Sequence, residues 1–242
     1  SEGTNFTGSL LVGHSTTGTI SSATYNTALG IGALDALTTA DYNVAIGYNA
    51  GTALTSGTAN VLLGANAGDA LTTGVKNIAI GTNALGAEDD HGRNVAIGHQ
   101  TLENQNAGAD AYNVAVGYHA GNVVSTGTYN TLVGGLAGDA LTTGINNVAM
   151  GAGALGSEDT GSSNVAIGSN ALNTLNHNGN GYNVAVGHNA GVLMVSGQQS
   201  TIIGALAGDA LTTGGENTVV GYNSLSEEDT GSKSTAIGHK AL

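Results

Sequence analysis

The pattern of polar and apolar residues repeats along almost the whole chain, and Asn43–Gly47, which reads Asn-Val-Ala-Ile-Gly, typifies its unit. The closing Gly of this motif recurs at 17-residue intervals, except for the 19-residue intervals that begin at Gly98 and Gly168. Fourteen motifs occur, and four successive intervals make a 70-residue super-repeat. Such a period is too short for a repeat built from two helices and is typical of one coil of a β-solenoid.

We number the positions of a coil from the residue that opens its motif, so that Asn43 is at position 0 and Gly47 at position 4. Residues 1–8 form a lead-in, and residues 9–242 are predicted to form a single all-β domain, a parallel β-solenoid (β-roll) of about 14 coils. The 70-residue super-repeats begin near residues 43, 113 and 183, and every fourth coil is a longer, 19-residue coil. The extra residues fall in Glu103–Ala111 and Asn173–Gly181, which we expect to bulge as polar loops.

Both faces of the predicted strand are apolar. Position 3 is always large, as at Ile46, whereas position 2 is mostly Ala, as at Ala45. Because neighbouring residues of a strand point to opposite faces, we expect Ile46 to pack inside the coil and Ala45 to point outward against another chain. The alternative is a wider single coil that folds over both faces. Position 2 carries a larger residue once per super-repeat, where a trimer seam would have to widen: Leu62, Leu132 and Ile202.

The second half of each coil is less regular. Position 11 is apolar in two coil types, as at Leu54, and position 14 is usually Gly, as at Gly57. We expect a coil to consist of a strand, a Gly corner, a short second strand and a Gly turn with positive φ. A third coil type has Glu at position 11 and is expected to turn differently, with its apolar residue three places earlier. Its Glu and Leu residues are Glu88, Glu158 and Glu228, and Leu85, Leu155 and Leu225.

Composition and charge exclude several classes of function. The net charge is −13 with only four Lys and Arg residues, so the chain lacks the cationic clusters that bind a nucleic-acid backbone. No apolar run approaches the roughly 20 residues that a membrane-spanning helix needs, so we expect no membrane insertion. The sequence contains no Cys and shows no signal peptide, and we interpret it as a processed chain or a fragment of a longer one.

The Asn residues at position 0 predict a structural ladder in which each side-chain amide bonds to the coils above and below. A binding role for this column is the alternative. The ladder continues from Asn26 through the following residues: Asn43, Asn60, Asn77, Asn94, Asn113, Asn130, Asn147, Asn164, Asn183 and Asn217.

Carboxylates recur in register on adjacent coils and are the candidate metal ligands. Ca²⁺ prefers oxygen donors of this kind, although the sequence lacks the Asp-rich motifs of known Ca²⁺ loops. The alternative is a set of exposed, solvated loops, and we expect no other cofactor. The candidate ligands are Asp69, Glu88, Asp89, Asp139, Glu158, Asp159, Asp209, Glu228 and Asp229.

Two further columns suggest ligand binding. Aromatic side chains that follow the corner Gly could stack on sugar rings, and ordinary surface residues are the alternative; they are His14, Tyr48, His99, Tyr118, His188, Tyr222 and His239. Thr pairs such as Thr72-Thr73 could bind ice, although other coils interrupt the array. We expect no enzyme activity, because each candidate acid recurs in every super-repeat, which suits a shaft or a multivalent binder better than one catalytic site.

The motif N-[VT]-A-[IV]-G, followed by x-x-A-[GL] and by T-T-G before the next Asn, resembles two families over essentially residues 9–242. One is the head repeat of trimeric autotransporter adhesins, a left-handed β-roll with a shorter unit. The closer match is the 17-residue repeat of phage tail fibres and related surface fibres, which often precedes an intramolecular chaperone domain. The 19-residue coils and the super-repeat depart from both patterns.

The resemblance implies a left-handed homotrimer outside the cell, on a virion fibre or a cell surface. We therefore expect a structural fibre or adhesin shaft that attaches to a surface and contacts a host glycan or receptor. The alternative is a monomeric solenoid that binds Ca²⁺, a glycan or ice on one face.

Overall fold

The computed structural model describes residues 8–13 and 22–242 and shows a parallel β-solenoid, which confirms the predicted fold class and the 17-residue period. His14 lies outside the described residues. The chain divides into two compact units, Ser1–Tyr118 and His119–Leu242.

Every coil contributes one strand of three residues, at positions 1 to 3. The first unit contains β1 (Leu10–Val12), β2 (Thr27–Leu29), β3 (Val44–Ile46), β4 (Val61–Leu63), β5 (Ile78–Ile80), β6 (Val95–Ile97) and β7 (Val114–Val116). The second unit contains β8 (Thr131–Val133), β9 (Val148–Met150), β10 (Val165–Ile167), β11 (Val184–Val186), β12 (Thr201–Ile203), β13 (Thr218–Val220) and β14 (Thr235–Ile237).

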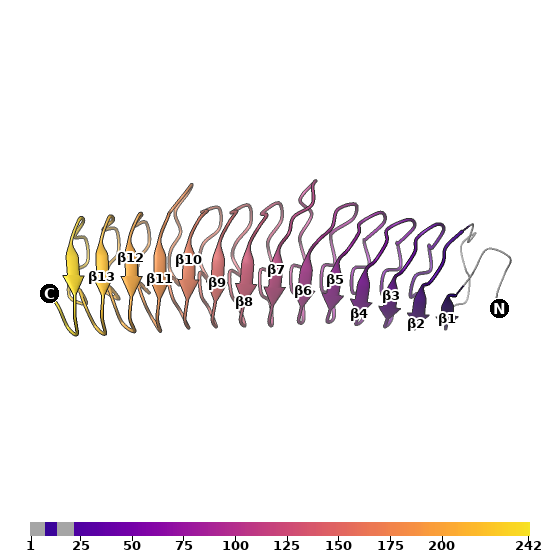
Figure 1. Ribbon diagram of the computed structural model, residues 1–242, viewed down its shortest axis with the longest axis horizontal. Coiled ribbons are helices and arrows are strands. Elements are labelled where there is room, and N and C mark those ends of the chain that lie inside the picture. The colour runs from indigo at the N-terminus through magenta and orange to yellow at the C-terminus, as the bar shows by residue number, and fades with distance from the viewer. Residues whose placement is uncertain (1–7, 14–21) are drawn as a thin grey trace. The chain divides into compact units, whose positions relative to one another are not determined.

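Within each unit, successive strands pair in parallel and in chain order (Figure 1). Equivalent positions always face each other, so that Ala45 lies opposite Leu62. This register also holds across a 19-residue coil, where Val95 lies opposite Val114. The two extra residues are therefore absorbed outside the sheet, and the loops after β6 and β10 project farther than their neighbours in Figure 1.

The orientation of the strand is opposite to the prediction. From β2 to β14 the middle residue of every strand is at most 1% exposed, and Ala45 is completely buried. Ile46, on the other face, is 38% exposed. The prediction that Ala45 points outward and Ile46 inward was therefore wrong. Leu side chains from the turns, such as Leu54 and Leu71, also lie in the core, so the space left at position 2 is mostly filled by Ala, and Ile46 lies outside.

The larger residues at position 2 fill the core rather than widen a seam. Leu62, Leu132 and Ile202 are all fully buried. A Cβ added at Gly51 would lie 2.6 Å from Cδ1 of Leu62, and one added at Gly68 would lie 2.8 Å from its Cδ2. One Leu thus occupies the space left by Gly at position 8 in its own coil and in the coil before. Six other described coils carry a buried Leu at position 8, as at Leu85, whereas Leu242 in the last coil is exposed.

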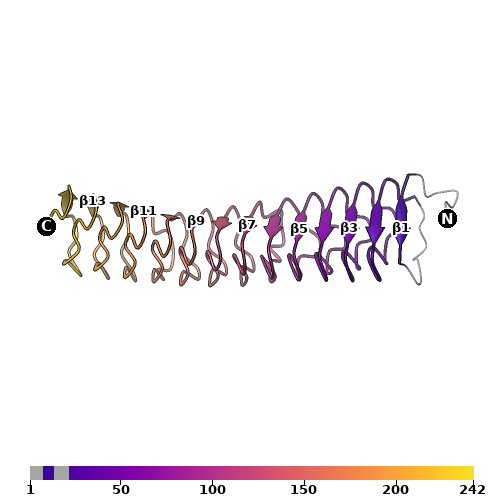
Figure 2. The ribbon, with the colours of Figure 1, turned by 90° about the horizontal axis from the view of Figure 1, so that it is seen from below.

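The rest of the coil is built from turns along the sides that the sheet leaves open (Figures 1 and 2). The predicted second strand is wrong, because outside the 14 strands the described residues form only an isolated bridge between Ser162 and Asn180. Gly47 makes the predicted corner with φ of 140°. Gly57 does not have the predicted positive φ; its role is to permit close approach, since a Cβ there would collide with the carbonyl oxygen of Gly74 on the next coil.

Candidate functional site

The outward side chains of the strands form an apolar surface in each unit, which we call the outer sheet face and define as positions 1 and 3. Position 1 is Leu, Val, Ile or Thr in every strand, and position 3 is Leu, Val, Ile or Met. Position 3 is partly exposed within the stack, reaching 38% at Ile46 and 40% at Ile203, and more exposed in strands near its ends, with Leu29 at 50% and Ile237 at 67%. Contiguous apolar surface of this kind marks interaction sites in soluble proteins.

Aromatic side chains border the outer sheet face at positions 16 and 5. Tyr42 and Tyr48 flank β3 and are 62% and 57% exposed. Some of these rings stack between adjacent coils, with centroids 5.1 Å apart for Tyr25 and Tyr42 and 5.5 Å apart for Tyr222 and His239. The face therefore combines aliphatic and aromatic surface, and its strands carry no charged residue.

The Asn column is buried and is bonded to the neighbouring coils. Oδ1 of Asn43 accepts the backbone N–H of Asn60 at 2.9 Å and its side-chain N–H at 3.0 Å. The Nδ2 of Asn60 also donates to the carbonyl of Gly74 farther along its own coil. Comparable bonds recur in the second unit, where Asn130 accepts from Asn147. The side chain of such an Asn thus hydrogen-bonds a carbonyl of its own coil and accepts a backbone N–H of the next coil. Because the column is buried, it presents no polar group to solvent.

The predicted carboxylate clusters separate into different environments. Asp69 does not join Glu88 and Asp89 in one group. It lies half-buried beside the loop after β6, where burial raises the pKa of its carboxyl group and the charge of Glu103 adds to the effect. The equivalent Asp139 and Asp209 are also half-buried, and burial raises the pKa of each.

Glu at position 11 closes a turn. An oxygen of Glu158 accepts the backbone N–H of Gly161 at 2.7 Å, and Glu228 accepts from Gly231 at the same distance. Glu88 makes the corresponding bond to the N–H of His91 at 3.1 Å.

Two of these acids, Glu88 and Glu158, are completely buried, and burial raises the pKa of both carboxyl groups. The Leu residues three places before the acids are buried as predicted, since Leu85 and Leu155 are 0% exposed. The sequence had not indicated that the Glu residues would be buried with them.

Of the predicted metal ligands, two belong to a compact group. Among the described residues, only Glu88, Asp89 and His91 place three potential ligand atoms within 4.8 Å of one another. Sequence reasoning missed His91, although its place three residues after Glu88 and next to a Gly was a usable signal. The acids of the second and third super-repeats have Gly at this place and form no such group in the described chain.

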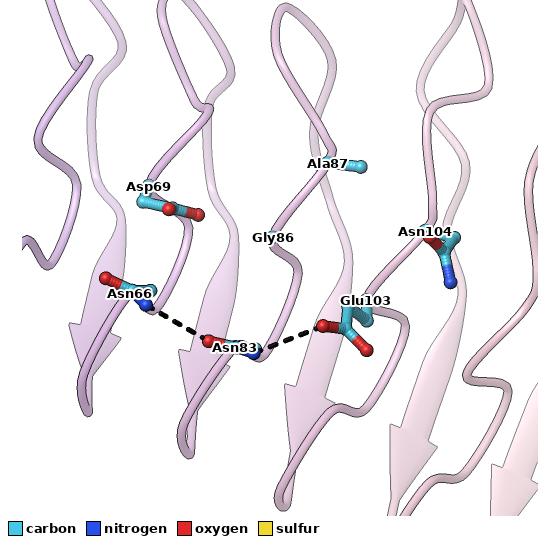
Figure 3. Close-up of a pocket in the computed structure, with 7 residues that line it drawn as sticks. All are labelled: Asn66, Asp69, Asn83, Gly86, Ala87, Glu103 and Asn104. Atoms are coloured by element: carbon cyan, nitrogen blue, oxygen red, sulfur yellow. Dashed lines mark hydrogen bonds between the residues drawn. The ribbon is translucent and has the colours of Figure 1, made fainter.

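A polar hollow of about 340 Å³ opens on the loops that follow β4, β5 and β6 (Figure 3). Asn66 donates to Asn83 at 3.2 Å, and Asn83 donates to Glu103 at 3.2 Å. Asp69 lies above this chain of hydrogen bonds. Carboxylates and amides of this kind can bind the hydroxyl groups of a sugar. The hollow belongs to the first super-repeat, because the positions of Asn66, Asn83 and Glu103 are occupied in the second by other residues, namely Leu136, Gly153 and Asn173.

The Thr pairs join adjacent coils. The hydroxyl of Thr38 donates to the carbonyl of Thr55 at 2.9 Å, and the hydroxyl of Thr142 donates to the carbonyl of Asp159 at 2.9 Å. The hydroxyl of the first Thr of these pairs is thus engaged with the backbone of the next coil, whereas the second Thr, as at Thr73 and Thr143, is exposed.

The geometry thus presents three features: the outer sheet face, the polar hollow and the Glu88 group. In the described part of the chain, no helix is long and apolar enough to cross a bilayer. Comparison with protein-family models, curated proteins and solved structures found no match to this chain.

Proposed function

We propose that this chain is a segment of a structural fibre or adhesin shaft that assembles as a homotrimer through its outer sheet face. The observation that supports the proposal is the exposed aliphatic surface of position 3, represented by Ile46 and Leu29, beside Val, Ile, Leu and Thr at position 1. Leaving such surface in water costs about 25 cal/mol for each Å² of apolar area. A partner that covers the face recovers this free energy in every coil.

A second copy of the chain is the partner that best fits this face. The register repeats every coil, so a parallel copy presents the same spacing along its whole length. The carboxylates that give the chain its charge of −13 lie outside the strands, mainly at positions 9 to 13. Copies can therefore meet at the sheet while their acidic turns stay in solvent. Three copies follow from the resemblance to trimeric fibres, as does a location on a virion or a cell surface.

Sedimentation equilibrium of the isolated chain tests the assembly. We expect three times the chain mass at micromolar concentration. A clean monomer would contradict the use of the face for assembly, and a dimer would contradict the trimer while leaving an interface at the face. No change in mass on removal of divalent ions is expected, because the apolar contact requires none.

The polar hollow supports a second role, the binding of a surface glycan by the first super-repeat. Asp69 and Glu103 supply carboxylate acceptors to the hollow, and Asn66 and Asn83 supply amides. Glycan-array binding of the chain tests this role. We expect Asp69→Asn and Glu103→Gln to weaken binding. Asp139→Asn is the matched control, because it changes the equivalent acid where the second super-repeat lacks the Asn and Glu partners. Equal binding by all three variants would exclude the hollow.

A further inference from the structure

One turn of the first super-repeat differs chemically from its two counterparts. It joins β5 to β6 and contains Glu88, Asp89 and His91. The corresponding residues are Glu158, Asp159 and Gly161 in the second super-repeat, and Glu228, Asp229 and Gly231 in the third. The imidazole is thus added to a carboxylate pair that all three turns share.

Two buried polar atoms of this turn lack hydrogen-bond partners. They are Oε2 of Glu88 and Nδ1 of His91. The side chain of Glu88 is 0% exposed, so bulk water cannot hydrogen-bond to its carboxylate. Its Oε1 is engaged by the backbone N–H of His91. The N–H of Ala107 attracts the carboxylate but forms no hydrogen bond with Oε2. In the second super-repeat the matching oxygen of Glu158 does accept a backbone N–H, from His177 at 3.3 Å.

The spacing of the donors is that of metal ligands. Oε1 of Glu88 and Nδ1 of His91 are 3.6 Å apart, which is too long for a hydrogen bond. Two ligands of a tetrahedral Zn²⁺ ion, each at about 2.1 Å, are about 3.4 Å apart. A carboxylate oxygen of Asp89 completes the group, with all three donors within 4.8 Å. The neighbouring Asp90 does not belong to the group, and its carboxylate accepts from the hydroxyls of Thr72 and Thr73 instead.

We propose that Glu88, Asp89 and His91 form a binding site for a single divalent transition-metal ion of the Zn²⁺ type. One imidazole and two carboxylates suit Zn²⁺, Co²⁺ or Mn²⁺. Ca²⁺ requires six to eight oxygen ligands, which this turn does not offer. The ion would neutralise the charge of the buried Glu88 carboxylate and link the three side chains of the turn.

The site is independent of the proposed assembly. It lies at positions 11 to 14, whereas the outer sheet face is formed by positions 1 and 3. Loss of metal binding would therefore leave the proposed trimer in place, and a monomeric chain would still offer the three donors.

Calorimetric titration of the chelator-treated chain with Zn²⁺ tests the proposal, and the visible absorption of bound Co²⁺ reports tetrahedral coordination. We expect one high-affinity ion per chain. His91→Gly installs the residue that the other two turns contain, and Glu88→Gln removes a carboxylate. Each should lower Zn²⁺ affinity by at least about tenfold, because even the loss of an outer-shell partner costs roughly 10- to 100-fold. Glu158→Gln is the matched control and should retain wild-type affinity.

Three results would overturn the site: no Zn²⁺ binding, equal binding by wild type and His91→Gly, or displacement of Zn²⁺ by a millimolar excess of Ca²⁺. The first two would leave a simple contact between the imidazole and the carboxylate. Thermal unfolding of His91→Gly, measured without metal, shows whether the variant folds. Added Zn²⁺ should raise the unfolding temperature of wild type and not that of His91→Gly.

Discussion

Asn60 donates two hydrogen bonds to Oδ1 of Asn43 on the coil before it, from its backbone at 2.9 Å and from its side chain at 3.0 Å. Its own Oδ1 then accepts the backbone N–H of Asn77. The side chain of Asn60 therefore pairs the backbone N–H that precedes β5 and the carbonyl of Gly74 in the turn of its own coil.

Asn60→Ala should destabilise the fold. It leaves the N–H of Asn77 and the carbonyl of Gly74 without the partners they have in wild type, and each buried unpaired group costs about 1–3 kcal/mol. Asn60→Ser should cost less, because Ser200 occupies the same position and its hydroxyl accepts the N–H of Asn217 at 3.2 Å. Urea unfolding measures both variants. Equal stability of the two would show that the retained acceptor contributes nothing.

Leu62 and Gly51 should be energetically coupled. Leu62→Ala alone opens a cavity and should cost about 2–5 kcal/mol. Gly51→Leu alone should also destabilise, because its Cβ would lie 2.6 Å from Cδ1 of Leu62. The double variant reproduces the pairing of Leu85 with Ala96 on the next coil, in which the Leu adopts a φ of 53°. We expect a favourable coupling of roughly 0.5–3 kcal/mol in a double-mutant cycle. If the losses of stability of the two single variants simply added in the double variant, the side chains of residues 51 and 62 would not compete for the same space.

The two faces of β3 should respond differently to substitution. Ala45→Leu adds volume inside the coil and should lower stability by about 1–3 kcal/mol or more. Ile46→Glu places a charge on the outer sheet face and should leave the coil folded while it weakens assembly. Thermal unfolding and sedimentation equilibrium separate the two effects. Unfolding of Ile46→Glu in the same manner as Ala45→Leu would contradict the assigned orientation.

Stability should fall as the pH rises from mildly acidic to neutral. Burial raises the pKa of several carboxyl groups in the folded chain: Asp69, Glu88, Asp139, Glu158 and Asp209. A group with a higher pKa in the folded state binds its proton more tightly there than in the unfolded chain. For Glu158 the resulting stabilisation is complete below the ordinary pKa of 4.5 and is lost as the pH rises through the raised pKa.

Urea unfolding of Glu158→Gln at several pH values measures this contribution. The variant should show a shallower loss of stability across the same window, because it carries no charge in the buried turn. Glu228→Gln, at the equivalent but partly exposed position, is the matched control for the loss of a carboxylate that accepts the N–H of a turn Gly. Asp90 acts in the opposite direction, since hydrogen bonds from Thr72 and Thr73 lower its pKa, but that contribution is lost only below a pH of 3.8. A wild-type chain that gains stability toward neutral pH would contradict the prediction.

The sites were less predictable than the fold. Asp69 and Glu88 occupy adjacent coils and were expected together, yet the turns direct Asp69 toward Glu103 instead. His91 was not a candidate, because its spacing from Glu88 is a weak signal for a metal ligand when it stands alone. Its significance depends on the closure of the turn by Glu88, which brings the imidazole beside a buried carboxylate.

The period, the strand positions, the Asn column and the Gly corner could be predicted from the sequence. Stacked coils place equivalent residues in equivalent surroundings. A residue type that one coil needs at a given position, such as the Gly at Gly47, therefore recurs at that position along the chain. Which face of the strand lies inside could not be predicted. Alternation separates Ala45 from Ile46, but only the width of the folded coil decides which is enclosed. A coil that makes one short strand and several tight turns leaves room for Ala45, and Ile46 therefore faces outward.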